Sequence, residues 1–244
     1  PNGMVASSQP LAVQAGVDIL KSGGNAIDAA IAVNAVLGVV EPMSCGIGGD
    51  LFAIYWDAAT KTLHGLNASG RAPYSANISA YRDEGLDAIP ARGPLSWSVP
   101  GCVDGWEAIR TRFGRLELEH ILSPAIEYAQ HGFPVSDIIA RDWGSSEELL
   151  GQWPGTAATF LPNGHAPKPG EVFRNPDLAK TYRRIAEGGR DSFYQGEIAE
   201  GIAACSSENG GFLSMRDLQD NTPTWDQPVS TNYRGFDLFE LPPS

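Results

Sequence analysis

The order of the elements predicted along the chain indicates an α+β fold, in which strands and helices are segregated. Two observations carry this prediction. A strand hairpin is expected early, between Leu51 and Ala68, and a second strand pair is expected near the end, at Trp225–Asn232 and Phe236–Leu241. The middle of the chain is predicted to be helical, and the sequence contains no internal repeat and no low-complexity tract.

The first helix is predicted over Pro10–Lys21, where apolar residues follow a helical spacing. Ser7 or Ser8 is the expected N-cap, and the proline in the first turn is typical of a helix start. Only the Gly23–Gly24 turn separates this helix from the next one. We therefore expect the two helices to pack side by side.

The second helix is predicted over residues 26–40. Asn25 is the expected N-cap, and Asp28 lies in the first turn, where its carboxylate meets the positive end of the helix dipole. Because Asp28 and Asn34 are the only polar side chains of this segment, we expect a central, buried helix. The segment is too short to cross a membrane, which requires about 20 apolar residues.

The early hairpin consists of a buried strand predicted at Leu51–Asp57 and a second strand at Thr62–Ala68. The second strand ends at Ser69-Gly-Arg-Ala-Pro73, where a charged side chain emerges. Strand ends are common places for functional residues.

The glycine-rich loop Gly46–Asp50 precedes the hairpin. Phosphate-binding loops run from a strand into a helix, so that a helix N-terminus faces the anion. This loop runs from a helix into a strand. We therefore interpret it as a place of close backbone packing and not as a nucleotide site.

Further helices are predicted from apolar residues at helical spacing, together with capping residues and glycine stops. They are expected at Val103–Phe113, Glu117–Gln130, Val135–Leu150, Asn175–Glu187, Ser192–Ser206 and Ser214–Gln219. Tyr74–Val99 is predicted to be loop-like, with short pieces such as Ile78–Arg82. Gln152–Arg174, which is rich in proline and glycine, is predicted to be an ordered surface loop.

The composition is that of an ordinary globular protein: 244 residues, 42% hydrophobic and 19% charged, with a formal net charge of −12. The sequence has no cluster of Lys and Arg that could bind phosphate groups, which argues against nucleic acid and anionic membranes as partners. Cys45, Cys102 and Cys205 are far apart and match no disulfide framework or metal motif, and no two histidines have a metal-ligand spacing. We expect neither a metal nor a cofactor.

Several motifs occur together in a fixed order along nearly the whole chain. They are Gly3-Met-Val-Ala-Ser-Ser, Gly23-Gly-Asn-Ala-Ile-Asp-Ala-Ala, Gly46-Ile-Gly-Gly-Asp-Leu-Phe, Ala72-Pro73, Ser98-Val-Pro-Gly-Cys-Val-Asp-Gly105, Arg234-Gly and Leu241-Pro-Pro-Ser244. In these motifs the chain resembles the γ-glutamyltranspeptidase family of N-terminal nucleophile (Ntn) hydrolases.

The resemblance implies a four-layer αββα sandwich assembled from two chains that an autoprocessing zymogen yields by self-cleavage. Residues 1–244 would be a single domain, the large-subunit part of such an enzyme. Family members use a threonine at the N-terminus of the small subunit as nucleophile. No catalytic residue is therefore expected in this chain, and its partner would be a small subunit from the same precursor, in an assembly that permits a dimer of heterodimers.

The resemblance also indicates where a substrate would bind. The family's pattern Phe-Arg-Glu-x-Ala-Pro carries an arginine that holds the substrate α-carboxylate. Aligned on Ala72-Pro73 without gaps, Ser69 occupies the position of that arginine, and Gly70 that of the glutamate. Arg71 follows two residues along, on the same face of an extended strand, and could supply the guanidinium. Arg71 and Ser69 are the candidate substrate-binding residues.

Three functions remain open at this stage. The chain could serve a γ-glutamyltransferase or γ-glutamyl hydrolase of glutathione metabolism, with Arg71 as the carboxylate ligand. It could instead belong to an amidohydrolase that takes another acyl group, such as a cephalosporin acylase or an enzyme for small amides. A third possibility is an inactive binding or scaffold homologue. No signal-peptide pattern is visible at the N-terminus, which favours the cytoplasm over the periplasm or secretion.

Overall fold

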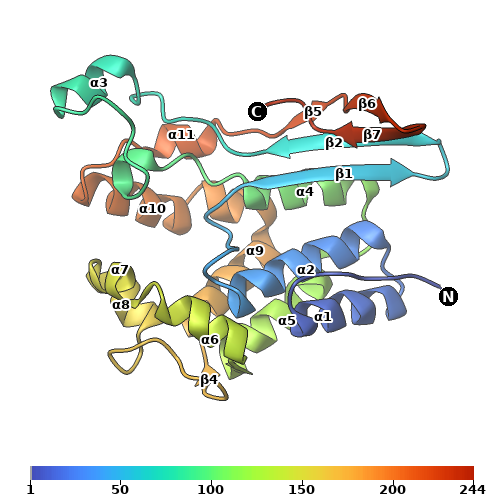
Figure 1. Cartoon of the computed structure of the whole chain (residues 1–244), viewed down its shortest axis with the longest axis horizontal. Coiled ribbons are helices and arrows are strands. Elements are labelled where there is room, and N and C mark those ends of the chain that lie inside the picture. Colours follow the sequence, from blue (N-terminus) through green and yellow to red (C-terminus); the bar gives the residue numbers. More distant parts are fainter. Residues whose placement is uncertain (1) are drawn as a thin grey trace. The chain divides into compact units, whose positions relative to one another are not determined.

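A computed structural model describes residues 2–244 (Figure 1). The chain divides into two compact units. The first, here called the helical unit, contains the residues up to Gly46 together with Gly114–Glu187. The second, here called the sheet unit, contains Ile47–Phe113 and Gly188–Ser244.

The helical unit is built on three helices: α1 (Pro10–Lys21), α2 (Ala26–Val40) and α5 (Leu118–His131). α2 packs against both α1 and α5, which confirms the prediction that the first two helices pack side by side. The predicted bounds of α1 are also confirmed, but its cap is not a serine. The side chain of Gln9 caps the helix by accepting a hydrogen bond of 2.6 Å from the Leu11 N–H.

The predicted N-cap Asn25 of α2 is confirmed, and together with Asp28 it forms a capping box. Asn25 Oδ1 accepts from the Asp28 N–H, and Asp28 Oδ2 accepts from the Asn25 N–H at 2.8 Å. The Asp28 carboxylate is fully buried and also accepts from the backbone N–H groups of Arg115 and Leu116, at 3.0 and 3.3 Å. This carboxylate therefore joins the start of α2 to the segment that leads into α5.

α2 is buried on most of its surface but not on all of it. Ile31, Ala35 and Val39 belong to the core, whereas Ala26 and Ala30 are exposed. The expectation of an almost completely buried helix is thus wrong for one narrow stripe. The small alanine side chains on that stripe gain little from burial, so its composition alone does not show which face is covered.

The remainder of the helical unit contains α6 (Asp137–Gly144), α7 (Glu147–Gly151), α8 (Pro154–Phe160), the short antiparallel pair of β3 (Phe133–Pro134) and β4 (Val172–Phe173), and the first part of α9 (Pro176–Tyr194). The single helix predicted at Val135–Leu150 is wrong, because α6 ends at Gly144 and a turn at Ser145 and Ser146 separates it from α7. Ser145 Oγ donates to the Asp142 carbonyl at 2.7 Å, which competes with continuation of the helix. The predicted loop Gln152–Arg174 contains α8, which begins with Pro154 at its first position.

The sheet unit contains an antiparallel sheet of order β1-β2-β5, formed by β1 (Leu51–Asp57), β2 (Thr62–Ala68) and β5 (Thr224–Asp226). The predicted hairpin is confirmed with its bounds, and Leu51 pairs with Ala68 at its open end. α4 (Cys102–Phe113) packs on β1 and β2. Gly105 permits the close approach, since a Cβ there would lie 2.8 Å from Leu51 and 2.9 Å from Ala68.

β1 is not the buried strand that its apolar sequence predicts. Phe52, Ile54 and Trp56 alternate along the strand and are 50%, 41% and 55% exposed, whereas the residues between them are half-buried. An apolar run without polar alternation is typical of a strand covered on both faces. Within the described part of the sheet unit, α4 covers one face of β1 and the other stays open.

The other elements of the sheet unit are α3 (Ile78–Asp83), a short 3₁₀ helix at Pro94–Ser96, α10 (Glu197–Glu208), α11 (Met215–Gln219), β6 (Val229–Tyr233) and β7 (Phe236–Glu240). The predicted strand Trp225–Asn232 is interrupted between β5 and β6 at Pro228, which cannot donate a backbone hydrogen bond. The predicted end of the helix at Gly188–Gly189 is a break inside α9, where Gly189 has φ 61°. The helix predicted at Ser192–Ser206 is wrong as a single element, because residues 192–194 end α9 and α10 begins at Glu197, after Gly196 with φ 70°.

Candidate functional site

The end of β2 carries the two residues that the sequence indicates, and both lie in the sheet unit. Ser69 is half-buried, and its N–H donates to Asn67 Oδ1 at 3.1 Å. Its hydroxyl donates to the Gly70 carbonyl at 3.4 Å. Arg71 is exposed.

The backbone between Ser69 and Arg71 does not continue the strand. β2 ends at Ala68, and Gly70 has φ +81°, in the left-handed region that favours glycine. The expectation that Ser69 and Arg71 share one face of an extended strand is therefore wrong, because the alternation of side chains holds only where the backbone is extended.

A second segment, Val99–Gly101, lies directly against this strand end. A Cβ on Gly70 would lie 1.7 Å from the Val99 carbonyl oxygen, and one on Gly101 would lie 2.0 Å from the Ala68 carbonyl oxygen. The Val99 N–H donates to the Arg71 carbonyl at 2.9 Å. Two glycines thus let the two backbones touch, and this contact determines the course of the chain from Ala68 to Arg71.

The glycine-rich loop that precedes β1 contributes to the same place through a carbonyl group. The N–H groups of Gly101 and Cys102 both donate to the Gly49 carbonyl at 3.0 Å. Added Cβ atoms on Gly46 and Gly48 would meet nothing within 4 Å. The predicted close packing is therefore confirmed for the backbone of Gly49. At Gly46 and Gly48 a side chain would meet no neighbour, so close packing does not explain why these residues are glycines.

The Arg71 side chain is available to an anion. Among residues 2–244 the structure gives its guanidinium no ion pair, and its central carbon lies 5.7 Å from the centre of the Tyr74 ring. Arg216 lies 4.5 Å from the same ring and pairs with Asp220 at 3.3 Å. The Tyr74 hydroxyl also donates to Asp220, at 3.2 Å. Arg216 is thus neutralised locally, whereas Arg71 is not.

A buried polar cluster lies behind Val99–Gly101, and the sequence does not reveal it. Asp104, in the first turn of α4, is 2% exposed. One of its carboxylate oxygens accepts from Arg190 Nε, and the other accepts from Asn221 Nδ2 at 2.6 Å. Arg190 Nη2 also donates to the Asn221 carbonyl at 2.5 Å. Burial raises the pKa of the Asp104 carboxyl above its ordinary value, although the bonds from Arg190 and Asn221 oppose this shift.

Tyr194 connects this cluster to the neighbouring backbone. Its hydroxyl donates to the Pro100 carbonyl at 2.6 Å and accepts from the Asp104 N–H at 3.0 Å. Burial raises the pKa of this phenol, so the hydroxyl stays protonated and remains a donor. The only sequence signal for the cluster is Asp104 itself, an acidic residue within an otherwise apolar helix start.

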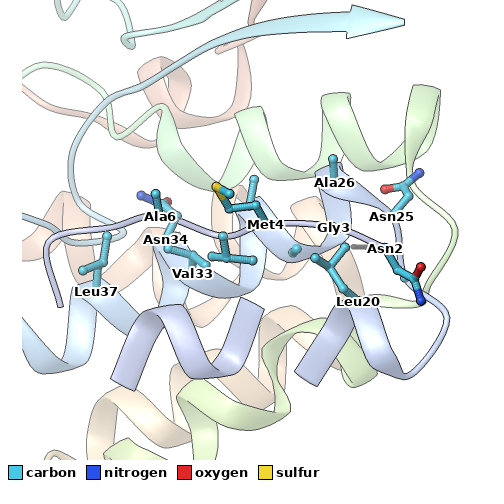
Figure 2. Close-up of a pocket in the computed structure, with 14 residues that line it drawn as sticks. Asn2, Gly3, Met4, Ala6, Leu20, Asn25, Ala26, Val33, Asn34 and Leu37 are labelled. Carbon is cyan, nitrogen blue, oxygen red and sulfur yellow. The ribbon is translucent and has the colours of Figure 1, made fainter. Parts of the chain in front are cut away.

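The helical unit contains a pocket of about 600 Å³ between its extended N-terminal segment and α2 (Figure 2). Figure 2 shows Gly3, Met4 and Ala6 of this segment beside the stripe of α2 that carries Ala26 and Val33. The lining residues are apolar, glycine or asparagine, and none of them is titratable. This pocket offers no group for acid–base or nucleophilic chemistry.

The described part of the chain shows no metal site and no membrane span. No cluster of three His, Cys, Asp or Glu side chains within residues 2–244 could hold a metal ion. No helix among these residues is long and apolar enough to cross a bilayer.

Comparison with known proteins decides the family. The family model described as Gamma-glutamyltranspeptidase matches residues 12–244. The chain belongs to the γ-glutamyltranspeptidase family. It is 43% identical over 242 residues to the glutathione hydrolase-like YwrD proenzyme of Bacillus subtilis, an alignment that covers 99% of this chain and 46% of that protein.

Two solved structures of the family resemble this one closely. The cephalosporin acylase of Bacillus halodurans has a TM-score of 0.95 at 45% identity, over 99% of this chain and 46% of that chain. The γ-glutamyltranspeptidase of Helicobacter pylori has a TM-score of 0.94 at 32% identity, over 100% of this chain and 70% of that chain. These similarities confirm the predicted α+β fold of the Ntn hydrolases. The chain spans about half the length of the curated relatives it matches.

Proposed function

We propose that this chain is the large-subunit part, in a single domain, of a γ-glutamyltransferase-like Ntn hydrolase that cleaves or transfers a γ-glutamyl amide. The nucleophile is a threonine at the N-terminus of a small subunit from the same precursor. Its hydroxyl oxygen attacks the γ-carbonyl carbon, the carbon–nitrogen bond breaks, and the amine leaves with a proton. Water or a second amine then attacks the resulting threonyl ester.

The role of this chain in the proposal is substrate recognition at the end of β2. The observation that carries it is the exposed guanidinium of Arg71, which has no ion pair within residues 2–244 and extends from a backbone that the Val99–Gly101 contact constrains. A guanidinium can bind a carboxylate through two parallel hydrogen bonds. In the proposed complex Arg71 binds the α-carboxylate of the γ-glutamyl group, and Ser69 contributes its hydroxyl nearby.

The open face of β1 supports the need for a second chain. Phe52, Ile54 and Trp56 form a row of large apolar side chains that are between 41% and 55% exposed. The β6–β7 hairpin exposes all of its residues, including Tyr233 and Phe236. Large exposed apolar side chains that lie in a row are typical of a protein interface. We propose that the small subunit covers it.

Substitution of Arg71 in the full-length two-chain protein tests the recognition role. Arg71→Ala is expected to lower kcat/KM for a γ-glutamyl anilide by at least about 30-fold, because loss of a desolvated carboxylate contact costs about 2 kcal/mol or more. The kcat/KM for a glutaryl anilide, which lacks the α-carboxylate, should stay within about twofold. Arg82→Ala, which removes another exposed arginine of the sheet unit, is the control. A change of less than about twofold on the γ-glutamyl compound in Arg71→Ala contradicts the proposal.

A second candidate is an acylase for another acyl group. It is favoured by Ser69, which stands where typical family members carry the carboxylate-binding arginine, and by the 45% identity to a cephalosporin acylase. This candidate predicts that the unmodified protein prefers the glutaryl compound. The scaffold alternative predicts no turnover of either compound.

A further inference from the structure

The buried cluster of Asp104, Arg190 and Asn221 joins parts of the sheet unit that are distant in sequence. Arg190 is 86 residues and Asn221 is 117 residues from Asp104. Their hydrogen bonds hold the first turn of α4, the second part of α9 and the segment after α11 together. The central carbon of Arg190 also lies 4.8 Å from the centre of the Tyr194 ring, which limits the positions this ring can take.

A continuous series of short contacts leads from this cluster to the substrate-binding end of β2. The Asp104 N–H donates to the Tyr194 hydroxyl, and this hydroxyl donates to the Pro100 carbonyl. The next contact is the bond of 2.9 Å from the Val99 N–H to the Arg71 carbonyl. At Gly70 the fit leaves no space for even one added carbon atom. A shift of Pro100 towards β2 would therefore press on the backbone from Gly70 to Arg71.

The ion pair of this cluster is not in itself evidence of added stability. A buried ion pair is often no better for stability than apolar side chains of the same volume. Asn221 Oδ1 is also buried without a hydrogen-bond partner among the described residues. If Asn221 were turned to satisfy this oxygen, its amide group would no longer donate to Asp104. These hydrogen bonds therefore specify one geometry for the three side chains.

We propose that Tyr194, held by Asp104, Arg190 and Asn221, is a positioning residue that fixes Val99–Gly101 against the end of β2 and thereby sets the place of Arg71. This inference rests on the proposed function of Arg71. Tyr194 itself does not touch the substrate in this proposal. It acts through the backbone of two adjoining segments.

Tyr194→Phe in the full-length protein removes the connecting hydroxyl and keeps the ring. The chain offers a matched control in Tyr182→Phe, because Tyr182 is also fully buried and donates its hydroxyl to a backbone carbonyl, that of Ala35, at 2.9 Å. Tyr182 lies in the helical unit, whereas the β2 end belongs to the sheet unit. Two properties are measured for each variant: the ratio of kcat/KM for γ-glutamyl anilide to that for glutaryl anilide, and amide hydrogen exchange at Val99 and Gly101.

Tyr194→Phe is expected to lower the γ-glutamyl preference about tenfold, mainly through KM, and to speed amide exchange at Val99 and Gly101. Tyr182→Phe should leave the preference within about twofold and these amides unchanged. Unchanged exchange or an unchanged preference in Tyr194→Phe overturns the inference. If Tyr194→Phe does not fold, Arg190→Lys, which keeps the charge but loses the two-pronged contact, is expected to give the same pair of changes.

Different measurements refute the proposed function and the positioning role of Tyr194. If the unmodified protein shows no γ-glutamyl preference, the proposed function fails, and the substrate role of Tyr194 fails with it. If the unmodified protein shows the preference and Tyr194→Phe retains it, only the positioning role is overturned.

Discussion

Alanine at Gly70 should disrupt the end of β2 through both a steric clash and backbone strain. Alanine at two other glycines tests each of these effects alone. Gly70 combines a left-handed φ of +81° with a would-be Cβ 1.7 Å from the Val99 carbonyl oxygen. Gly101 has a similar clash, at 2.0 Å from the Ala68 carbonyl oxygen, without a left-handed φ. Gly85 has a φ of +73° with nothing within 4 Å of an added Cβ. The three Gly→Ala variants therefore measure the effect of the steric clash and the effect of the backbone strain separately.

The magnitudes follow from these geometries. An alanine in the left-handed region costs about 1–2 kcal/mol, and the reduced freedom of the unfolded chain offsets about 0.4–1 kcal/mol of this. Overpacking adds about 1–3 kcal/mol, and a backbone carbonyl yields less readily than a side chain. We expect Gly70→Ala to lower the free energy of unfolding by about 2–4 kcal/mol, Gly101→Ala by about 1–2 kcal/mol and Gly85→Ala by about 1 kcal/mol or less.

Urea denaturation of the full-length variants measures these differences, and kcat/KM for the γ-glutamyl anilide measures their effect on the site. Gly70→Ala and Gly101→Ala should both reduce kcat/KM, because each clash displaces the backbone beside Arg71. Gly85→Ala should retain kcat/KM within about twofold. The reasoning is refuted if Gly70→Ala is no more destabilising than Gly85→Ala and keeps its activity.

Two further substitutions test the buried carboxylates. Asp28→Asn is expected to lower the free energy of unfolding by about 3 kcal/mol, because the buried carboxylate that accepts from three backbone N–H groups is lost. Asp18→Asn, which changes an exposed carboxylate, should have a much smaller effect. Equal effects of the two substitutions would contradict this explanation. Burial raises the pKa of Asp104 above its ordinary 3.8, so the folded protein binds this proton more tightly than the unfolded chain does. The stability of the parent relative to Asp104→Asn should therefore decrease as the pH rises from about 4 through the raised pKa, and an increase over this range would show that the shift has the opposite sign.

Local signals made much of the fold predictable. The N-cap of α2 at Asn25 and the bounds of α1, α2, β1 and β2 follow from patterns among residues that are close in sequence. The missed features depend on the rest of the molecule. Whether an apolar strand such as β1 is covered depends on what packs against it, and Pro154 starts a helix where the same residue could equally mark a turn.

At the candidate site, too, local features were predictable and those that depend on distant residues were not. The sequence places Ser69 and Arg71 at a strand end, and the structure has them there. The left-handed Gly70 and its contact with Val99 depend on a segment about thirty residues further along, which no local pattern could identify. The partners of Asp104 are still more distant in sequence. The sequence could therefore indicate the candidate residues but not what holds them in place.

The central claim is that this chain recognises the amino acid part of a γ-glutamyl amide. The most direct measurement compares kcat/KM of the unmodified two-chain protein for a γ-glutamyl anilide and for its glutaryl analogue, which lacks the α-amino and α-carboxyl groups. The account predicts a clear preference for the γ-glutamyl compound. A preference for the glutaryl compound would contradict it and favour an acylase, and turnover of neither compound would favour the scaffold alternative.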